Sequence, residues 1–281
     1  MENRTADVLI VGAGPTGLMM ANLLKLQNIS FRIIDKKEGA TELSKALGVQ
    51  PRTLELFEQI GLSIEGMPVT SAHLHANKEE IAVVDFTKID SKYKHVTIFP
   101  QSDMEKLLIG KLEKAEKKIA WKTELVDIQP LKDGAEVRLA YADGRIQTEQ
   151  YTWVVGCDGA HSSVRHKMNV SFGGSEDKMC FGLADVEIDG EVPQDQIITN
   201  IAKAGLFACF PLPNGKFRLV VDRLSDPDNE LTPNDWEILF NDRSPVAGKI
   251  KAIDWQSKFY INYRLARHFK QGHLLLAGDA A

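Results

Sequence analysis

The chain has 281 residues, of which 43% are hydrophobic and 26% charged, a balance typical of a soluble globular protein with a sizeable core. Its 34 basic and 39 acidic residues leave a net charge of -5, so no basic field indicates nucleic-acid binding. No apolar run approaches the roughly 20 residues of a membrane-spanning helix. Three widely spaced cysteines fit a reducing cytoplasm better than a disulfide framework. We therefore expect a cytoplasmic protein without membrane or nucleic-acid partners.

The N-terminal residues predict a βαβ unit that opens a parallel sheet. Residues 7–11 form a short apolar run, and residues 15–26 carry apolar side chains at helical spacing. Residues 30–34 form a second apolar run, which ends at Asp35. A strand, a helix and a second strand in this order are typical of nucleotide-binding α/β domains.

A glycine-rich turn, Gly12-Ala13-Gly14-Pro15-Thr16-Gly17, joins the first predicted strand to the helix. In this pattern Gly12 permits the tight turn, Gly14 lets the backbone approach a pyrophosphate, and Gly17 lets the helix pack on the strand. The N-terminus of the helix offers N–H donors and positive potential to phosphates. The turn alone is compatible with NAD, NADP or FAD.

Asp35 lies about 20 residues beyond the glycine turn, where a ribose-binding carboxylate is expected. A carboxylate there argues against the 2′-phosphate of NADP. Lys36 weakens that argument slightly, and we include it in the same site. NAD and FAD remain open at this point.

The rest of the chain alternates between strands and a few helices. Helices are predicted at residues 51–60, 101–117 and 231–240, each from apolar spacing or a proline at the start. Hairpin turns are predicted at Asp143-Gly144 and Asn214-Gly215. Strands are predicted at residues 72–76, 81–86, 96–99, 124–128, 136–141, 151–155, 181–188, 197–201, 206–210, 217–221, 253–265 and 274–277.

Two later turns narrow the choice of nucleotide. The run 155–165, VGCDGAHSSVR, places Asp158 between a strand end and a helix that Ser162 or Ser163 can cap. The run 274–279 is a third strand, which ends in Gly278-Asp279. A carboxylate there could accept hydrogen bonds from a polyol, and FAD has a ribitol chain whereas NAD has none. The three turns therefore favour FAD.

At these motifs the chain resembles the FAD-dependent aromatic hydroxylases, the group A flavoprotein monooxygenases whose type member is p-hydroxybenzoate hydroxylase. The resemblance covers nearly the whole chain. It depends on GAGPTG at 12–17, CDGAHSSVR at 157–165 and LLLAGDAA at 274–281, with support from residues 45–62 and from Gln101 at the start of its helix.

The resemblance implies a role for each matching residue. Gly12, Gly14, Thr16 and Gly17 would hold the FAD pyrophosphate, and Asp35 would bind the adenosine ribose. Lys45, where the family usually has arginine, would reach the pyrophosphate as a point charge, and Gln101 would bind near the phosphates. Leu125 would meet the adenine through its backbone, Asp158 would serve both FAD and NAD(P)H binding, and Asp279 would bind ribitol.

The implied activity is hydroxylation of an aromatic or polyketide-like molecule with NAD(P)H and O2, through a flavin C4a-hydroperoxide. NAD(P)H would bind transiently, because no second glycine fingerprint is present. An acid–base triad is not required, and a homodimer is one state open to the protein. We expect no metal, because no cluster of ligand residues completes a site in the sequence. The alternatives are a halogenase or reductase of the same flavin superfamily, or a non-catalytic FAD-binding module.

The implied fold is α/β: a Rossmann-like FAD-binding domain interleaved with a mostly antiparallel β-sheet domain for the substrate. We expect residues 1–71, 95–178 and 266–281 in the first domain and residues 72–94 and 179–265 in the second. Phe181, Phe207 and Phe210 could line a substrate pocket, although core packing explains them equally well.

The sequence ends at Ala281, inside its third flavin motif, whereas the family continues with a Pro- and Gly-rich loop and helices. We expect that a chain without that loop binds FAD weakly and, when reduced, releases peroxide instead of hydroxylating.

Overall fold

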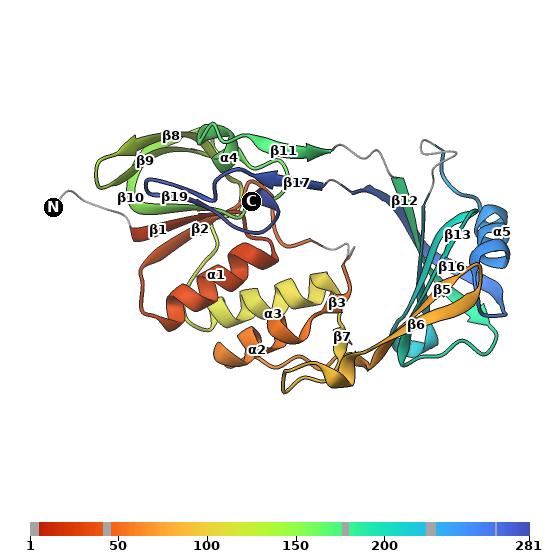
Figure 1. Ribbon diagram of the computed structural model, residues 1–281. Coiled ribbons are helices and arrows are strands. Elements are labelled where there is room, and N and C mark those ends of the chain that lie inside the picture. The colour runs from red at the N-terminus through yellow and green to blue at the C-terminus, as the bar shows by residue number, and fades with distance from the viewer. Residues whose placement is uncertain (1–5, 42–45, 176–179, 223–228, 262) are drawn as a thin grey trace. The chain divides into compact units, whose positions relative to one another are not determined.

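The computed structural model describes residues 6–41, 46–175, 180–222, 229–261 and 263–281, which form two compact units (Figure 1). The first unit comprises Met1–Ala46, Pro100–Gly174 and Arg264–Ala281. The second unit comprises Leu47–Phe99 and Ser175–Tyr263. Each unit is thus assembled from separate stretches of the chain, as expected for interleaved domains.

The division differs from the sequence expectation mainly at residues 47–71 and 95–99, which lie in the second unit. Two domain boundaries also shift by a few residues, since Ser175 lies in the second unit and Arg264 and Leu265 lie in the first. A small sheet in the order β3-β7-β4 accounts for the main difference. Its residues Val69 and Ile98 are buried in one hydrophobic cluster with Leu212 of the second unit. The apolar side chains of these short strands therefore complete the core of the second unit. Their bounds are β3 (Gly48–Val49), β4 (Met67–Val69) and β7 (Val96–Ile98).

The first unit contains a seven-stranded sheet in which β1, β2, β10 and β19 run parallel. The order β18-β19-β10-β1-β2 is extended by β9 and β8, which pair antiparallel beside β10. The bounds are β1 (Ala6–Val11), β2 (Phe31–Ile34), β8 (Thr123–Leu131), β9 (Gly134–Tyr141), β10 (Ile146–Gly156), β18 (Lys270–Gln271) and β19 (Leu274–Leu276).

Helices cover both faces of this sheet (Figure 1). The helices α1 (Pro15–Leu26) and α3 (Gln101–Glu113) pack together, and α1 also contacts β1 and β2. The short helix α4 (Ser163–Lys167) packs against β8, β10 and β19. Separately, β11 (Phe172–Ser175) pairs with β17 (Tyr263–Ala266). The α/β class expected from the sequence is confirmed.

The second unit is built on a seven-stranded, mostly antiparallel sheet with α5 (Pro233–Arg243) on one face. Its strand order is β16-β12-β15-β14-β13-β5-β6, and among these pairs β13 and β5 run parallel. The bounds are β5 (Ser71–Ala76), β6 (Glu79–Asp85), β12 (Cys180–Asp189), β13 (Gln196–Ala202), β14 (Gly205–Pro211), β15 (Phe217–Asp222) and β16 (Lys249–Tyr260). The remaining helix of this unit is α2 (Pro51–Gln59).

Local details explain where the helices begin and end. The helix α3 ends at Glu113, short of the expected residue 117, because Glu116 adopts a left-handed backbone with φ of 58°. The helix α5 begins at Pro233 because the side chain of Thr232 caps it and forms a capping box with Asp235.

Among the described residues, no helix combines the length and apolarity needed to cross a membrane.

A polar network ties three strands of the first unit together. Arg32 on β2 donates two hydrogen bonds to the carboxylate of Glu149 on β10, and a third, of 2.9 Å, to the Tyr141 hydroxyl on β9. The hydroxyls of Tyr141 and Tyr151 also donate to Glu149. Burial alone would raise the pKa of Glu149, but the hydrogen bonds from Tyr151, Arg32 and Tyr141 outweigh it and hold the pKa below its ordinary value.

This network predicts an acid-dependent contribution to stability. Because the pKa of Glu149 is lowered in the folded protein, its stabilisation is complete above the unfolded pKa of about 4.3 and is lost as the pH falls. We expect Glu149→Gln to lower the free energy of unfolding at pH 7 by about 1.5–3 kcal/mol, the range for hydrogen bonds to a charged group. Urea unfolding at pH 7 and near pH 3.5 should show this difference shrink at the lower pH. A difference that is the same at both pH values would contradict the assignment.

Candidate functional site

Four parallel strands of the first unit end at the same edge of the sheet. Main-chain hydrogen bonds continue the ladder one residue beyond the strand ends. The N–H of Gly12 donates to Ile34 O at 2.8 Å, and the N–H of Cys157 donates to Val11 O at 2.7 Å. The N–H of Ala277 donates to Gly156 O at 2.9 Å. The turns after β1, β10 and β19 are therefore held at one level, at the carboxyl ends where ligands bind in open α/β sheets.

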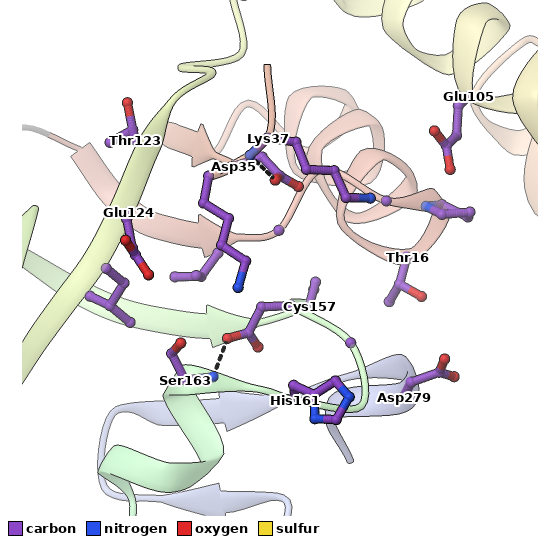
Figure 2. A pocket seen from close by; sticks show the side chains of 18 of the residues that line it. Thr16, Asp35, Lys37, Glu105, Thr123, Glu124, Cys157, His161, Ser163 and Asp279 are labelled. Carbon is purple, nitrogen blue, oxygen red and sulfur yellow. Dashed lines mark hydrogen bonds between the residues drawn. The ribbon is translucent and has the colours of Figure 1, made fainter. Parts of the chain in front are cut away.

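A cavity of about 520 Å³ lies at this edge. Its size is within the range of small-molecule and cofactor sites. In Figure 2, Thr16, His161 and Asp279 lie on one side of the cavity, with Thr123 and Glu124 on the other. The residues predicted for the cofactor site that line this cavity are Gly12, Gly14, Thr16, Asp35, Lys36, Gln101, Leu125, Asp158 and Asp279.

The glycines of the first turn meet two different requirements. Gly12 has a φ of 102°, and a Cβ there would lie 2.4 Å from Cys157 O. A Cβ on Gly17 would lie 1.9 Å from Gly12 O, so Gly17 is required for packing and does not line the cavity. For Gly14 no other atom of the described residues lies within 4 Å of the corresponding position, so this glycine borders open space in the cavity.

The N-terminus of α1 faces this cavity without a side-chain cap. Gly14 is the N-cap residue, Pro15 occupies the first turn, and no acidic residue lies in that turn. The first N–H groups of a helix have no partner within the helix, and they carry the positive end of its dipole. This end of α1 is therefore suited to an anionic group.

The carboxylate of Asp35 fixes the turn while it lines the cavity. Its Oδ2 accepts a hydrogen bond of 2.8 Å from the N–H of Ala13, and its Oδ1 accepts one of 2.8 Å from the N–H of Lys37. Each carboxylate oxygen has two acceptor sites, so both retain capacity for a ligand hydroxyl.

The turn after β10 places Asp158 between the cavity and α4. Its Oδ2 accepts hydrogen bonds from the N–H groups of Ser163 at 2.6 Å and Val164 at 3.3 Å. The Ser162 hydroxyl accepts from the N–H of Arg165 at 3.0 Å, which confirms the predicted cap. Asp158 Oδ1 is buried and has no hydrogen-bond partner in the described part of the chain. A buried acceptor without a partner is costly, and a ligand donor would satisfy it.

Arg165 connects this turn to the last one. Its Nη1 donates to Ala280 O at 3.0 Å and its Nη2 to Ala160 O at 2.7 Å. Its guanidinium also lies 3.7 Å from the centre of the Phe172 ring. Arg165 is 3% exposed, so these contacts are made away from solvent. They hold the turn that carries Asp279 against the turn that carries Asp158.

Cys157 lines the cavity but does not supply a nucleophile. Burial, together with the charge of Asp158, raises the pKa of its thiol to about 12. The reactive form of a cysteine is the thiolate, which is negligible at neutral pH for such a pKa. The described residues also contain no group of three His, Cys, Asp or Glu side chains placed to hold a metal ion.

Some predicted site residues lie elsewhere. Lys45 is outside the described residues. Phe181, Phe207 and Phe210 belong to the second unit, where Phe207 is wholly buried and packs edge-on against Phe240. Phe181 stacks on Phe259, with ring centres 5.2 Å apart. Contact of these rings with a substrate stays a prediction.

Several lining residues were missed by the sequence reasoning. Lys37, Thr123, Glu124 and Ser163 adjoin residues or strands that were named, so the neighbouring motifs could have indicated them. Glu105 had a weaker signal, its spacing of four residues from Gln101 on one helix face. The lining residues without a predicted role at the cofactor are Val11, Pro15, Lys37, Ala46, Glu105, Thr123, Glu124, Cys157, Gly159 and Ser163. His161, which also lines the cavity, was considered for cofactor contact, although a surface turn position was favoured.

Comparisons with solved structures agree with this architecture. A p-nitrophenol 4-monooxygenase from Pseudomonas putida superposes with a TM-score of 0.85 and 21% sequence identity. The match covers 100% of this chain and 74% of the monooxygenase chain. An anhydrotetracycline hydroxylase from Streptomyces rimosus is 27% identical, with a TM-score of 0.75, over 98% of this chain and 56% of its own. The Rossmann-like fold with its second, mostly antiparallel sheet is therefore shared with flavin-dependent hydroxylases.

Sequence comparison also finds monooxygenases among the similar proteins. Pentachlorophenol 4-monooxygenase from Sphingobium chlorophenolicum is 29% identical over 297 residues, which cover 100% of this chain and 54% of that protein. The chain spans about half the length of the curated relatives it matches. The family model described as FAD binding domain matches residues 5–281. The chain therefore belongs to the FAD binding domain family, as its three turn motifs predicted.

Proposed function

We propose that the cavity of the first unit binds FAD. We propose further that the protein acts as a monooxygenase, which uses NAD(P)H and O2 to hydroxylate an aromatic or polyketide-like small molecule. The observation that carries the proposal is the meeting of three strand-end turns in one cavity. A single glycine-rich turn suits many nucleotides, whereas three turns in register suit a long dinucleotide with hydroxyls between its ends.

The donor and acceptor groups of the cavity fit FAD. The uncapped N-terminus of α1 and the open space beside Gly14 would receive the pyrophosphate. Asp35 would accept from the adenosine ribose. Asp158 Oδ1, which is buried and has no hydrogen-bond partner among the described residues, would accept a donor of the flavin portion, and the exposed Asp279 would accept from ribitol.

The chain's own residues would bind and orient the cofactor without acting as an acid or nucleophile. When bound, FAD supplies the chemistry, taking reducing equivalents from NAD(P)H and activating O2 for transfer of one oxygen atom. The high pKa of Cys157 keeps a competing thiolate out of the cavity. The names of the relatives, which specify pentachlorophenol, p-nitrophenol and anhydrotetracycline, support a phenolic or polyketide-like aromatic substrate.

The glycines of the first turn provide a test that separates ligand binding from folding. We expect Gly14→Ala to keep the melting temperature of the wild type, because its methyl group would meet no atom of the part of the chain that the structure describes. The same methyl group would occupy the approach to the pyrophosphate. The substitution should therefore raise the Kd for FAD at least about tenfold, which corresponds to ~1.4 kcal/mol of binding free energy. Fluorescence titration of FAD measures the effect.

Gly12→Ala and Gly17→Ala are the matched controls for this experiment. Each would bring a Cβ within 2.4 Å of a backbone oxygen, so both should lower the melting temperature. If Gly14→Ala binds FAD like the wild type, the pyrophosphate does not approach this turn and the proposed site is wrong.

The activity is tested by cofactor and oxygen consumption. We expect the chain to bind FAD, and the enzyme that contains it to oxidise NADH or NADPH faster when a phenolic ligand is added. Product analysis by mass spectrometry should find one added oxygen atom, derived from labelled O2. FAD binding without any substrate-stimulated oxidation or oxygen incorporation would favour a non-catalytic FAD-binding module.

A further inference from the structure

Glu105 is a carboxylate at an unexpected place. It lies on α3, it is only 3% exposed, and it lines the cavity in which we propose that the FAD pyrophosphate binds. Figure 2 shows Glu105 beside the other lining residues. A negative charge there opposes an anionic ligand, and burial of a carboxylate is itself costly unless its oxygens are hydrogen-bonded. The side chain therefore needs an explanation other than direct attraction of FAD.

Both oxygens of Glu105 accept hydrogen bonds, one from a residue that lines the cavity and one from the backbone of the segment before α2. Its Oε1 accepts from the side-chain Nε2 of Gln101 at 2.9 Å. Its Oε2 accepts from the backbone N–H of Thr41 at 3.2 Å. The N–H of Gln101 in turn donates to Ala46 O at 3.2 Å. The first turns of α3 are thus bonded both to Thr41 and to Ala46.

An ionised carboxylate only accepts hydrogen bonds, so it determines which end of a neighbouring amide faces it. Gln101 must turn its NH2 group towards Glu105, and this fixes the orientation of the whole amide plane. A neutral amide at position 105 would lack this control, because it could donate to the Gln101 oxygen instead.

We infer that Glu105 is a positioning residue for cofactor binding: it orients the Gln101 amide at the cavity and holds the Thr41 backbone against α3. The inference rests on the proposed function for its effect on FAD, whereas the contact with Thr41 exists without a ligand. Glu105 acts through these two partners and takes no part in the chemistry.

The direction in which one substitution changes the FAD Kd separates this role from a simple charge effect. Glu105→Gln keeps the size of the side chain and removes its negative charge. If charge alone mattered, FAD would bind more tightly to the variant. If orientation matters, we expect the FAD Kd to rise about tenfold, the factor for loss of one well-placed hydrogen bond. A Kd that is unchanged or lower overturns the inference.

Two further variants show that the effect passes through Gln101. Glu113→Gln makes the same charge change at an exposed position of the same helix and should leave the FAD Kd unchanged. In a Gln101→Met background, Glu105→Gln should add little to the loss that Gln101→Met causes alone. A full additional loss in that background would show that Glu105 does not act through Gln101.

A measurement without ligand tests the contact with Thr41. In Glu105→Ala the Thr41 N–H loses its acceptor, so we expect its hydrogen exchange to become faster than in the wild type and in Glu113→Gln. An unchanged exchange rate of the Thr41 N–H would show that Glu105 does not hold the Thr41 backbone. If the wild-type chain binds no FAD at all, the proposed function has failed, and the exchange result alone decides the inference.

Discussion

Backbone hydrogen bonds just beyond the parallel strands are the constraint on which the cavity of the first unit depends. The bonds from Gly12 to Ile34 and from Cys157 to Val11 join β1 to its neighbours on both sides. A third bond, from Ala277 to Gly156, adds β19. Because these groups belong to the main chain, the hydrogen bonds that join the strand ends do not use side chains. The carboxylates of Asp35, Asp158 and Asp279 can therefore face the cavity instead of holding the strands together.

The same register leaves almost no space between the turns. The carbonyl of Cys157 lies where a side chain on Gly12 would begin, and a Cβ on Gly278 would lie 2.5 Å from Thr16 Oγ1. These glycines are required by protein packing before any ligand binds. Gly14 differs from them, because no atom of the described chain lies within 4 Å of the position that its Cβ would take. The glycine-rich sequence thus combines a packing requirement with a ligand requirement, and only the structure separates the two.

Local patterns were sufficient to predict the parts of the fold whose causes are local. Helical spacing and the glycine turn predicted β1, α1 and β2, and the Ser162 cap on α4 was anticipated within a residue. The pairing of β13 with β5 was not foreseen, because it joins residues such as Ile197 and Ala72 through a register set only by tertiary packing. Tertiary packing also explains why the small sheet of β3, β4 and β7 belongs to the second unit and not, as the sequence had predicted, to the first. A single sequence records periodicity, but it does not record which apolar faces meet.

Glu105 shows why a cofactor site is harder to predict than a fold. On α3 its charge is ordinary for a helix rich in lysine and glutamate, and its sequence neighbours do not distinguish it from Glu113. Burial and two donors distinguish it, since Gln101 and Thr41 approach its separate oxygens from different segments. An acceptor-only group can impose an orientation on an amide, which a neutral group of the same shape cannot do. A carboxylate can therefore assist an anion site by arranging the donors around it, provided that the orientation it imposes outweighs its repulsion of the ligand.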